Sequence, residues 1–391
     1  MSVAIPLPRH RFRPAWAEID LDAIAANAAI LAAMGAPAGL CAVVKADGYG
    51  HGAVPVARAA RRGGAAWLGV ALVEEGVELR QAGLDGPILV LSEPTPGAMA
   101  EVVARDLTPT LYTAAGVESA TAEVGRSGRS RPLAVHVKVD TGMHRVGATP
   151  DAAVALALDV AARPELELGG FWTHFAVADE IDDPYTAGQM ERFEAASARL
   201  RVAGVVPPLC HAANSAATLW HPDARLDLVR CGIALYGLAP AAAGIGAPEM
   251  IGLRPALTLR ARVSHVKTVA AGERLSYGLR YRLEVPSVVA TVPIGYADGV
   301  PRILAAAGGE VLLGGRRRPL AGTVTMDQIL VDCGPDGQGG AGVAVGDDVV
   351  LLGAQGDEHI GAWEWANLTG TISYEIVCGL SQRVPRIYLG A

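Results

Sequence analysis

Only three side chains of this sequence could do the chemistry of a primary amine. The chain has 391 residues, 33 of them basic, and among these only Lys45, Lys138 and Lys267 are lysines. The other basic residues are arginines, which supply positive charge but cannot form a Schiff base. A lysine kept against this background indicates chemistry that needs an amine.

Lys45 stands where such chemistry is expected. An apolar run, residues 42–44, precedes it, and the sequence Gly-Tyr-Gly-His-Gly follows at 48–52. Burial strips water from an ammonium group, so that it loses its proton, finds a partner or reacts. The alternative for Lys45 is an amine solvated at the end of a strand. The glycine-rich turn favours a reactive lysine over this alternative.

Charge and cysteine content narrow the class of partner. The net charge is −7 and the longest basic run is residues 316–318, so neither a nucleic-acid partner nor a polybasic membrane anchor is expected. The five cysteines are an odd number without any CxxC, which argues against disulfides and a zinc site. No signal peptide or membrane span is apparent. We therefore expect a cytoplasmic protein with a small-molecule partner and no metal.

The elements that must position Lys45 follow from alternating patterns. Short β-branched runs alternate with alanine-rich stretches from residue 38 onward, which is typical of a parallel sheet of βα units. The eight predicted strands are 40–44, 67–72, 88–91, 108–112, 133–139, 168–175, 209–212 and 226–233. The predicted helices are 54–62, 74–81, 97–105, 114–124, 151–162 and 189–202. This pattern predicts an α/β fold, a (β/α)8 TIM barrel, with a doubly wound sheet as the alternative.

Polar residues follow the predicted strands, at the carboxyl ends where barrels carry their active sites. They are Lys45 after the first strand, Lys138, Asp140 and Arg145 after the fifth, His174 after the sixth, Asn214 and Ser215 after the seventh, and Arg230, Gly232 and Ile233 after the eighth. Phosphate in such barrels often binds at the loops after strands seven and eight. Ser215 and the amides of Gly232 and Ile233 are therefore a candidate phosphate site.

The fifth predicted strand separates a polar face from an apolar one. His136, Lys138 and Asp140 share one parity, and the intervening residues are valines. In a barrel the valines would pack against helices and the polar residues would point inward. An internal salt-bridge network that serves only the fold is the alternative, and for His136 we favour it.

The pattern changes after the Gly- and Pro-rich residues 239–248. Short strands at 257–269, 287–292, 310–313, 329–333 and 348–352 predict an antiparallel β domain. Residues 363–380 combine a short helix with a polar segment around Tyr374, either strand or helix. We expect the barrel to span residues 14–245 and the β domain 246–391, with residues 1–13 as a candidate addition to the latter.

Nine motifs follow one another across both predicted domains. They are AVVKADGYGHG at 42–52, KVDTGMHRVG at 138–147, THFAVAD at 173–179, HAANSAA at 211–217, VRCGIALYG at 229–237, ERLSYG at 273–278, PIGYADGVPR at 293–302, GTVTMDQ at 322–328 and TISYEIVCGLSQRVPR at 371–386. With these motifs the sequence resembles the bacterial alanine racemases over nearly its whole length. The resemblance implies a barrel with a β domain and the cofactor pyridoxal 5'-phosphate.

The resemblance also implies a role for each matching residue toward the cofactor. Lys45 would hold it covalently, and Arg230 would donate a hydrogen bond to its ring nitrogen, beside His174. Because an arginine keeps its proton, that nitrogen would stay neutral and the cofactor would be a weaker electron sink. The phosphate would lie among Tyr49, Asn214, Ser215, Gly232, Ile233 and Tyr374.

Racemisation needs a proton-transfer group on each face of the substrate's alpha carbon. By resemblance these groups are Lys45 and Tyr277 of the partner subunit, which implies a homodimer with shared active sites. An unperturbed tyrosine titrates at ~10, so its neighbours should activate the phenol.

The same resemblance assigns residues that would bind the substrate and line its entrance. Arg145 and the amide of Met326 would bind the substrate carboxylate, with Asp327 in support, and Tyr296 and Tyr374 would narrow the entrance. Lys138 matches a lysine carbamylated in many members, a modification that would let it orient Arg145. Thr325 departs from the cysteine of many relatives, so it receives no role beyond lining the site.

Three alternatives to a strict alanine racemase remain. One is a racemase with broader amino-acid specificity, since a methylene or hydroxyl discriminates by only ~1–3 kcal/mol. A second is a fold-related decarboxylase of basic amino acids, although Arg230 replaces the acidic partner of the ring nitrogen. A third is a cofactor carrier made of the barrel alone, which would leave Tyr277 without a purpose. The sequence leaves open whether the product serves the cell wall or L-alanine supply.

Overall fold

The computed structural model describes residues 12–240, 252–338, 340 and 342–390, and these divide into two units. The barrel unit contains the described residues from 21 to 240 and from 252 to 254, and the β unit contains those from 12 to 20 and from 255 to 390. The expected boundary between residues 245 and 246 lies outside the described residues. Within the described ranges, no helix is long and apolar enough to cross a membrane.

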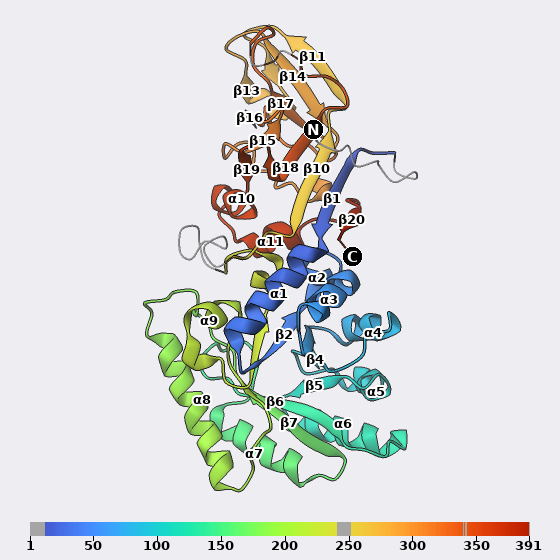
Figure 1. The fold of residues 1–391 in the computed structure, drawn as a ribbon, viewed down its shortest axis with the longest axis vertical. Coiled ribbons are helices and arrows are strands. Elements are labelled where there is room, and N and C mark those ends of the chain that lie inside the picture. Colours follow the sequence, from blue (N-terminus) through green and yellow to red (C-terminus); the bar gives the residue numbers. More distant parts are fainter. Residues whose placement is uncertain (1–11, 241–251, 339, 341, 391) are drawn as a thin grey trace. The chain divides into compact units, whose positions relative to one another are not determined.

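The barrel unit is built on eight parallel strands, as the alternating pattern predicted (Figure 1). Two backbone hydrogen bonds bring the outer strands together, from Asp227 to the carbonyl of Cys210 and from Arg230 to that of Ala213, both at 3.0 Å. The (β/α)8 prediction is thus confirmed. The strands are β2 (Gly39–Val43), β3 (Trp67–Val70), β4 (Ile88–Val90), β5 (Thr108–Leu111), β6 (Leu133–Lys138), β7 (Leu166–Trp172), β8 (Cys210–His211) and β9 (Leu228–Cys231).

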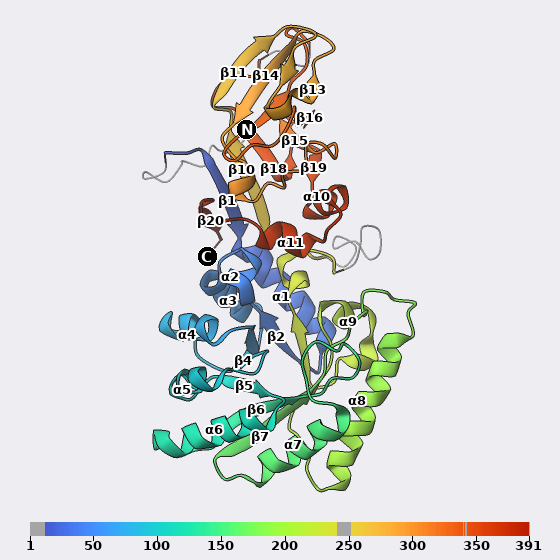
Figure 2. The ribbon, with the colours of Figure 1, turned by 180° about the vertical axis from the view of Figure 1, so that it is seen from behind.

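Helices surround these strands on the outside (Figure 2). Six of them match the predicted helices, although α8 begins four residues earlier than predicted; α1 and α9 were not predicted. Thr113 and Thr149 cap α6 and α7 by accepting backbone N–H bonds, which satisfies amides that lack a partner in the first turn. The helices are α1 (Leu21–Gly35), α3 (Ala53–Arg62), α4 (Val73–Gln81), α5 (Met99–Ala104), α6 (Ala114–Ser127), α7 (Pro150–Ala162), α8 (Tyr185–Val202) and α9 (Ser215–Trp220).

The β unit holds a seven-stranded sheet, in which β1 pairs antiparallel with β10 and parallel with β20. Residues 15–20, which we expected in the barrel, therefore pair with strands of the β unit. The strands are β1 (Ala15–Asp20), β10 (Leu257–Arg262), β15 (Glu310–Leu313), β16 (Arg317–Pro319), β18 (Asp348–Gln355), β19 (Glu358–Ile360) and β20 (Arg386–Leu389).

A three-stranded antiparallel sheet and a short hairpin complete the strands of the β unit. The single strand expected at 257–269 is instead two strands, β10 and β11, which belong to different sheets. The polar segment around Tyr374 is helical. The elements are β11 (His265–Val269), β14 (Ser287–Val292), β17 (Ile329–Asp332), the hairpin strands β12 (Arg274–Leu275) and β13 (Tyr281–Arg282), and the helices α10 (Ala362–Thr369) and α11 (Ser373–Cys378).

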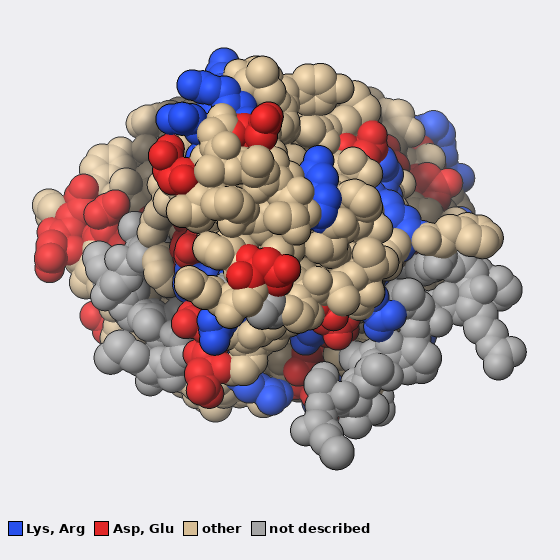
Figure 3. Space-filling view, turned by 90° about the horizontal axis from the view of Figure 1, so that it is seen from above, with Lys and Arg blue, Asp and Glu red and all other residues tan. Residues whose placement is uncertain are grey.

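The surface carries charges of both signs on the face that Figure 3 shows. Lys and Arg side chains lie interspersed with Asp and Glu there, between larger uncharged areas. Among the described side chains of this face, the mixed pattern leaves no continuous positive stripe of the kind that attracts the phosphate backbone of nucleic acids.

Candidate active site

Lys45 begins α2 (Lys45–Tyr49), a turn that departs from ordinary helical geometry. Ala46, Asp47 and Tyr49, together with two glycines, have positive φ angles between 52° and 78°. Each non-glycine residue in this left-handed region costs roughly 1–2 kcal/mol. Strain of this kind persists only where the surroundings impose it, and it concentrates at functional sites.

Two carboxylates hold the strained turn in place. Glu75 accepts the N–H of Ala46 at 2.6 Å, and Asp47 accepts the N–H of Ala53 at 2.9 Å. The preceding residue, Val44, continues the sheet by donating to the carbonyl of Gly69 at 2.8 Å. Lys45 itself is half-buried. Sheet and turn together present its amine at the carboxyl ends of the barrel strands.

The residues of the candidate phosphate site lie together. The hydroxyl of Ser215 accepts the N–H of Gly232 at 3.0 Å, and the ring of Tyr49 stacks on Tyr236 at 4.9 Å. A Cβ on Gly232 would come within 2.2 Å of the Tyr49 hydroxyl, so only glycine permits this close approach. Asn214 caps α9 by accepting the N–H of Ala217 at 2.9 Å.

Arg230 lies fully inside the barrel, where its terminal nitrogens are held by the protein. Nη1 donates to His211 Nδ1 at 2.8 Å, and Nη2 donates to the carbonyls of Thr173 at 2.8 Å and Ala212 at 2.9 Å. Nη2 also lies 3.2 Å from His174 Nδ1. Within the described part of the chain, Nε of Arg230 makes no hydrogen bond to another protein group.

The bond from Arg230 sets the tautomers of two buried histidines. A guanidinium only donates, so His211 Nδ1 must accept and its proton must lie on Nε2. That Nε2–H donates to His136 Nδ1 at 2.9 Å, which places the proton of His136 on its own Nε2. The chain of bonds therefore runs from Arg230 through His211 to His136.

Burial, reinforced by the charge of Arg230, keeps these histidines neutral. It lowers the pKa of His136 to about 3 and holds the pKa values of His174 and His211 well below their ordinary value. The pKa of Arg230 falls to about 10, again through burial, so this side chain remains charged at neutral pH.

Lys138 is the second unusual amine of the barrel. Its Nζ lies over the ring of Trp172, 4.4 Å from the centroid, and the side chain is buried. Burial first, then the charges of Arg230 and Arg145, lower its pKa to about 7. No carboxylate of the described residues lies within ion-pair distance of Lys138. The salt-bridge network that we favoured for His136 is also wrong within the described residues: His136 makes a hydrogen bond to His211, and Lys138 makes a cation–π contact.

Positive charge dominates the barrel interior. Among the charges with the largest effect on Lys138, those of Arg230, Arg145 and Lys45 lower its pKa and that of Asp140 raises it. Arg145 is exposed and forms no ion pair among the residues that the structure describes. A site with this excess of cations attracts anions such as phosphates and carboxylates.

The β unit carries a second set of predicted residues around an open pocket of 540 Å³. We call it the Tyr277 pocket; its lining includes Tyr277, Tyr296 and Met326. Tyr277 is 75% exposed, and its carbonyl accepts the hydroxyl of Thr323 at 2.8 Å. Thr325 and Asp327 line the same pocket, whereas Tyr374 lies on α11 and does not.

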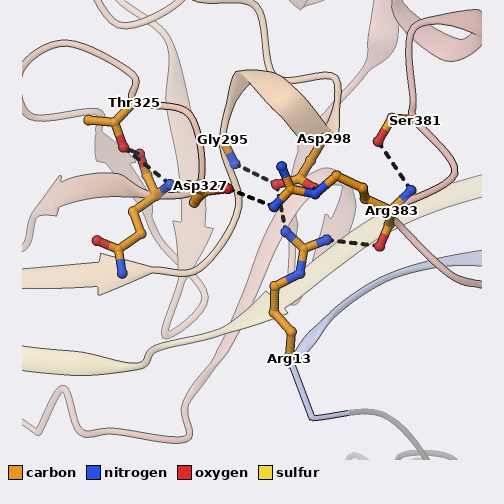
Figure 4. A network of polar contacts seen from close by, with 8 residues as sticks. Arg13, Gly295, Asp298, Thr325, Asp327, Ser381 and Arg383 are labelled. Atoms are coloured by element: carbon orange, nitrogen blue, oxygen red, sulfur yellow. Dashed lines mark hydrogen bonds and ion pairs between the residues drawn. The ribbon is translucent and has the colours of Figure 1, made fainter.

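Several residues of these sites were not predicted. His211 opens the motif HAANSAA, and its place at the end of a predicted strand was the signal that could have identified it. Trp172, which contacts both Lys138 and Arg230, had no signal beyond its strand. Arg13 had no signal, and Arg383 lies in the motif at 371–386 but was not singled out; both arginines bind Asp298, as Figure 4 shows.

Comparison with known proteins accounts for both units. The family pattern described as "Alanine racemase, N-terminal domain" matches residues 19–240, and "Alanine racemase, C-terminal domain" matches residues 256–388. An alanine racemase of Symbiobacterium thermophilum is 50% identical over 378 residues, which cover 97% of this chain and 98% of that protein. One of Thermobifida fusca is 45% identical over 380 residues, covering 96% and 98%.

Solved structures agree with the sequence comparison. The crystal structure of alanine racemase from a D-cycloserine-producing Streptomyces lavendulae superimposes with a TM-score of 0.91, at 42% identity and 98% coverage of both chains. That from E. faecalis has a TM-score of 0.89 at 39% identity and covers 98% of this chain and 100% of its own. With both domain patterns matched in order and identity of this extent over nearly the full length, the chain belongs to the alanine racemase family.

Proposed function

We propose that the protein interconverts L- and D-alanine with the help of pyridoxal phosphate. The observation that carries the proposal is the presentation of Lys45 by a strained turn beside Arg230, in an interior dominated by positive charge. Membership of the alanine racemase family supports the reaction and the substrate. The decarboxylase alternative is not favoured, because both matched domain patterns are those of alanine racemases.

The residues present fit the cofactor. The close approach of Gly232 to Tyr49 and the hydroxyl of Ser215 form a compact cradle for a phosphate, to which we add Ile233 and the adjoining Asn214. The N–H of Arg230 Nε is available for a ring nitrogen, and His174 lies beside it. Lys45 supplies the amine for covalent attachment. Tyr374 remains a phosphate contact proposed from the family resemblance.

When bound, pyridoxal phosphate supplies an electron sink for the charge that develops at the substrate's alpha carbon. Arg230 tunes this sink: its guanidinium keeps its proton, so it stabilises an unprotonated ring nitrogen. With that nitrogen unprotonated, the cofactor would withdraw electrons less strongly, and this would favour return of the proton to the alpha carbon. The relay through His211 and His136 holds Arg230 in this orientation.

Two groups of the protein move protons in the proposed reaction. Nζ of Lys45 removes the proton from one face of the alpha carbon, and the hydroxyl of Tyr277 of the partner subunit donates a proton to the other face. The roles reverse for the opposite enantiomer. Arg145 and the amide of Met326 hold the substrate carboxylate, and Tyr296 and Tyr374 narrow the entrance.

We further propose a cytoplasmic homodimer with shared active sites. All five cysteines are free thiols, and Cys41, Cys231 and Cys333 are buried, which fits a reducing compartment. A shared site follows from the proposed bases, because Lys45 belongs to the barrel unit and Tyr277 to the β unit. Sedimentation of the purified protein at assay concentration tests the dimer, and a monomeric active species would contradict it.

The test is the optical activity of L-alanine and of D-alanine over time, with purified protein and pyridoxal phosphate. Both signals should decay to zero with equal kcat/KM, because the two enantiomers have equal free energy in solution. A protein that changes neither substrate contradicts the proposal. The same assay with L-serine examines broader specificity, which would be favoured by a kcat/KM comparable to that for L-alanine.

A further inference from the structure

Figure 4 shows a charged clamp in the β unit, and one of its members, Asp327, lines the Tyr277 pocket. The clamp consists of Arg13, Asp298, Asp327 and Arg383. Asp298 receives Arg13 Nη1 at 2.7 Å and lies 3.4 Å from Arg383 Nε, while Arg383 Nη2 donates to Asp327 at 2.6 Å. The guanidinium of Arg383 thus connects two carboxylates that lie on different loops.

The first loop carries Tyr296, and the buried side chain of Asp298 holds this loop in its conformation. The side chain of Asp298 is fully buried, and its carboxylate accepts the N–H of Gly295 at 3.0 Å. The backbone carbonyl of Asp298 accepts the N–H of Ser381 at 3.1 Å. A buried carboxylate requires such partners, because an unpaired charge away from water is costly. Its contacts therefore define the conformation of the short helix η6 (Tyr296–Asp298).

The second loop carries Met326, and two backbone bonds join it to the first. The backbone N–H of Tyr296 donates to the carbonyl of Thr325 at 3.0 Å, and the backbone N–H of Ala297 donates to the carbonyl of Met326 at 3.1 Å. The next residue, Asp327, accepts the hydrogen bond by which Arg383 binds this loop. Arg13 braces the clamp from the other side, since its Nη2 donates to the carbonyl of Arg383 at 2.9 Å.

We propose that Arg383 is a positioning residue of the enzyme, which holds Tyr296 and the Met326 amide where substrate must enter and bind. The inference rests on the proposed function for the roles of these two residues. Arg383 reaches two carboxylates because its donors form a planar fork, which the single ammonium of a lysine cannot reproduce. Loss of the fork frees the two loops to shift relative to one another without removing any group that contacts substrate.

The test compares Arg383→Gln, Arg383→Lys and Asp327→Asn with the wild-type enzyme. For Arg383→Gln we expect KM for both enantiomers to rise about three- to tenfold while kcat falls less than about twofold. Arg383→Lys should be intermediate, because one contact survives. Asp327→Asn should add little to Arg383→Gln in the double variant, since both remove the same bond.

Amide hydrogen exchange provides a readout that does not depend on activity. Peptides covering 293–303 and 322–330 should exchange faster in Arg383→Gln, because the bonds between the loops open more often. Asp348→Asn is the matched control: it breaks another Arg–Asp pair of this unit, to Arg262 at 3.1 Å, away from the pocket. It should leave KM and both peptides unchanged.

The outcomes separate the clamp from the proposed function. Unchanged KM and unchanged exchange in Arg383→Gln overturn the positioning role. Faster exchange across the whole β unit, with a lowered melting temperature, also overturns it, because the residue would then serve stability alone. An inactive wild-type protein counts against the proposed function only, and hydrogen exchange still decides the clamp.

Discussion

At the scale of single residues, the proposed role of Lys45 depends on its amine, which can bind the cofactor covalently, and not on its positive charge. Lys45→Arg keeps the positive charge but removes the amine, so we expect activity to fall by at least about a thousandfold. Reduction with borohydride should then leave no cofactor attached to the chain, as read by intact mass. The control is Lys267→Arg, on the exposed strand β11, which should keep both properties. Cofactor bound covalently to Lys45→Arg would contradict the assignment.

Lys138 should react with carbon dioxide. Its pKa of about 7 leaves much of the amine neutral at neutral pH. The neutral nitrogen can add to carbon dioxide and release one proton, which converts a neutral amine into a carbamate anion near Arg145. We expect isotope-labelled bicarbonate to give one carbamate signal in the carbon NMR spectrum, absent in Lys138→Met. A wild-type spectrum without this signal would show that the amine stays unmodified.

The unmodified amine of Lys138 also links stability to pH. Its pKa is lower in the folded chain than its ordinary value of 10.5, so between about pH 7 and that value the unfolded chain binds this proton and the folded chain does not. The free energy of unfolding should therefore rise with pH across this window. Urea titrations at several pH values, with carbon dioxide excluded, should show a smaller rise for Lys138→Met. An equal rise in both proteins would show that Lys138 does not titrate in this way.

At the scale of elements, the chain of bonds from β9 through β8 to β6 tests whether His136 supports Arg230. His136→Leu removes the acceptor of the His211 proton and should lower the free energy of unfolding by about 1–3 kcal/mol. His136→Asn offers an oxygen near the position of Nδ1 and should restore much of it. Arg230 should lose its orientation only in the leucine variant, seen as a shifted absorption band of the bound cofactor.

The buried neutral histidines should also make the free energy of unfolding fall as the pH is lowered. The pKa of His136 is about 3 in the folded chain, below its ordinary value of 6.5. Between these two pH values the unfolded chain binds a proton at this histidine and the folded chain does not. Each such histidine lowers the free energy of unfolding by about 1.4 kcal/mol per pH unit. His136→Asn should therefore show a slope smaller by about one proton between pH 6 and pH 4. An unchanged slope would contradict the buried neutral state.

At the scale of the whole molecule, a site that needs two subunits can be tested by mixing inactive variants. Lys45→Ala and Tyr277→Phe should each be inactive, but a heterodimer of the two contains one site with both bases intact. After unfolding and refolding at equal amounts, activity should recover to about one quarter of wild type, as expected for random pairing in a twofold-symmetric dimer. Sites built within one chain would give no recovery.

The sequence alone determined the architecture and the positions of most candidate residues. All eight barrel strands were predicted, because the βα alternation is a local pattern that hydrophobic periodicity records. Lys45 stood out because lysine is rare in this chain, and strand ends located Arg230, Ser215 and Gly232. Strand boundaries in the β unit were predicted less accurately. The sequence pattern predicted one strand over β10 and β11, because nothing in the sequence marks the change from one sheet to the other.

Only the tertiary structure decided how these residues interact. The strain of the Lys45 turn depends on Glu75, 30 positions along the chain, which accepts the Ala46 amide. The neutrality of His136 depends on burial and on the charge of Arg230, which lies on a different strand. The clamp joins Arg13 to Asp298 and Arg383. Burial and long-range hydrogen bonds set protonation and orientation, and because they arise between residues far apart in sequence, local patterns cannot specify them.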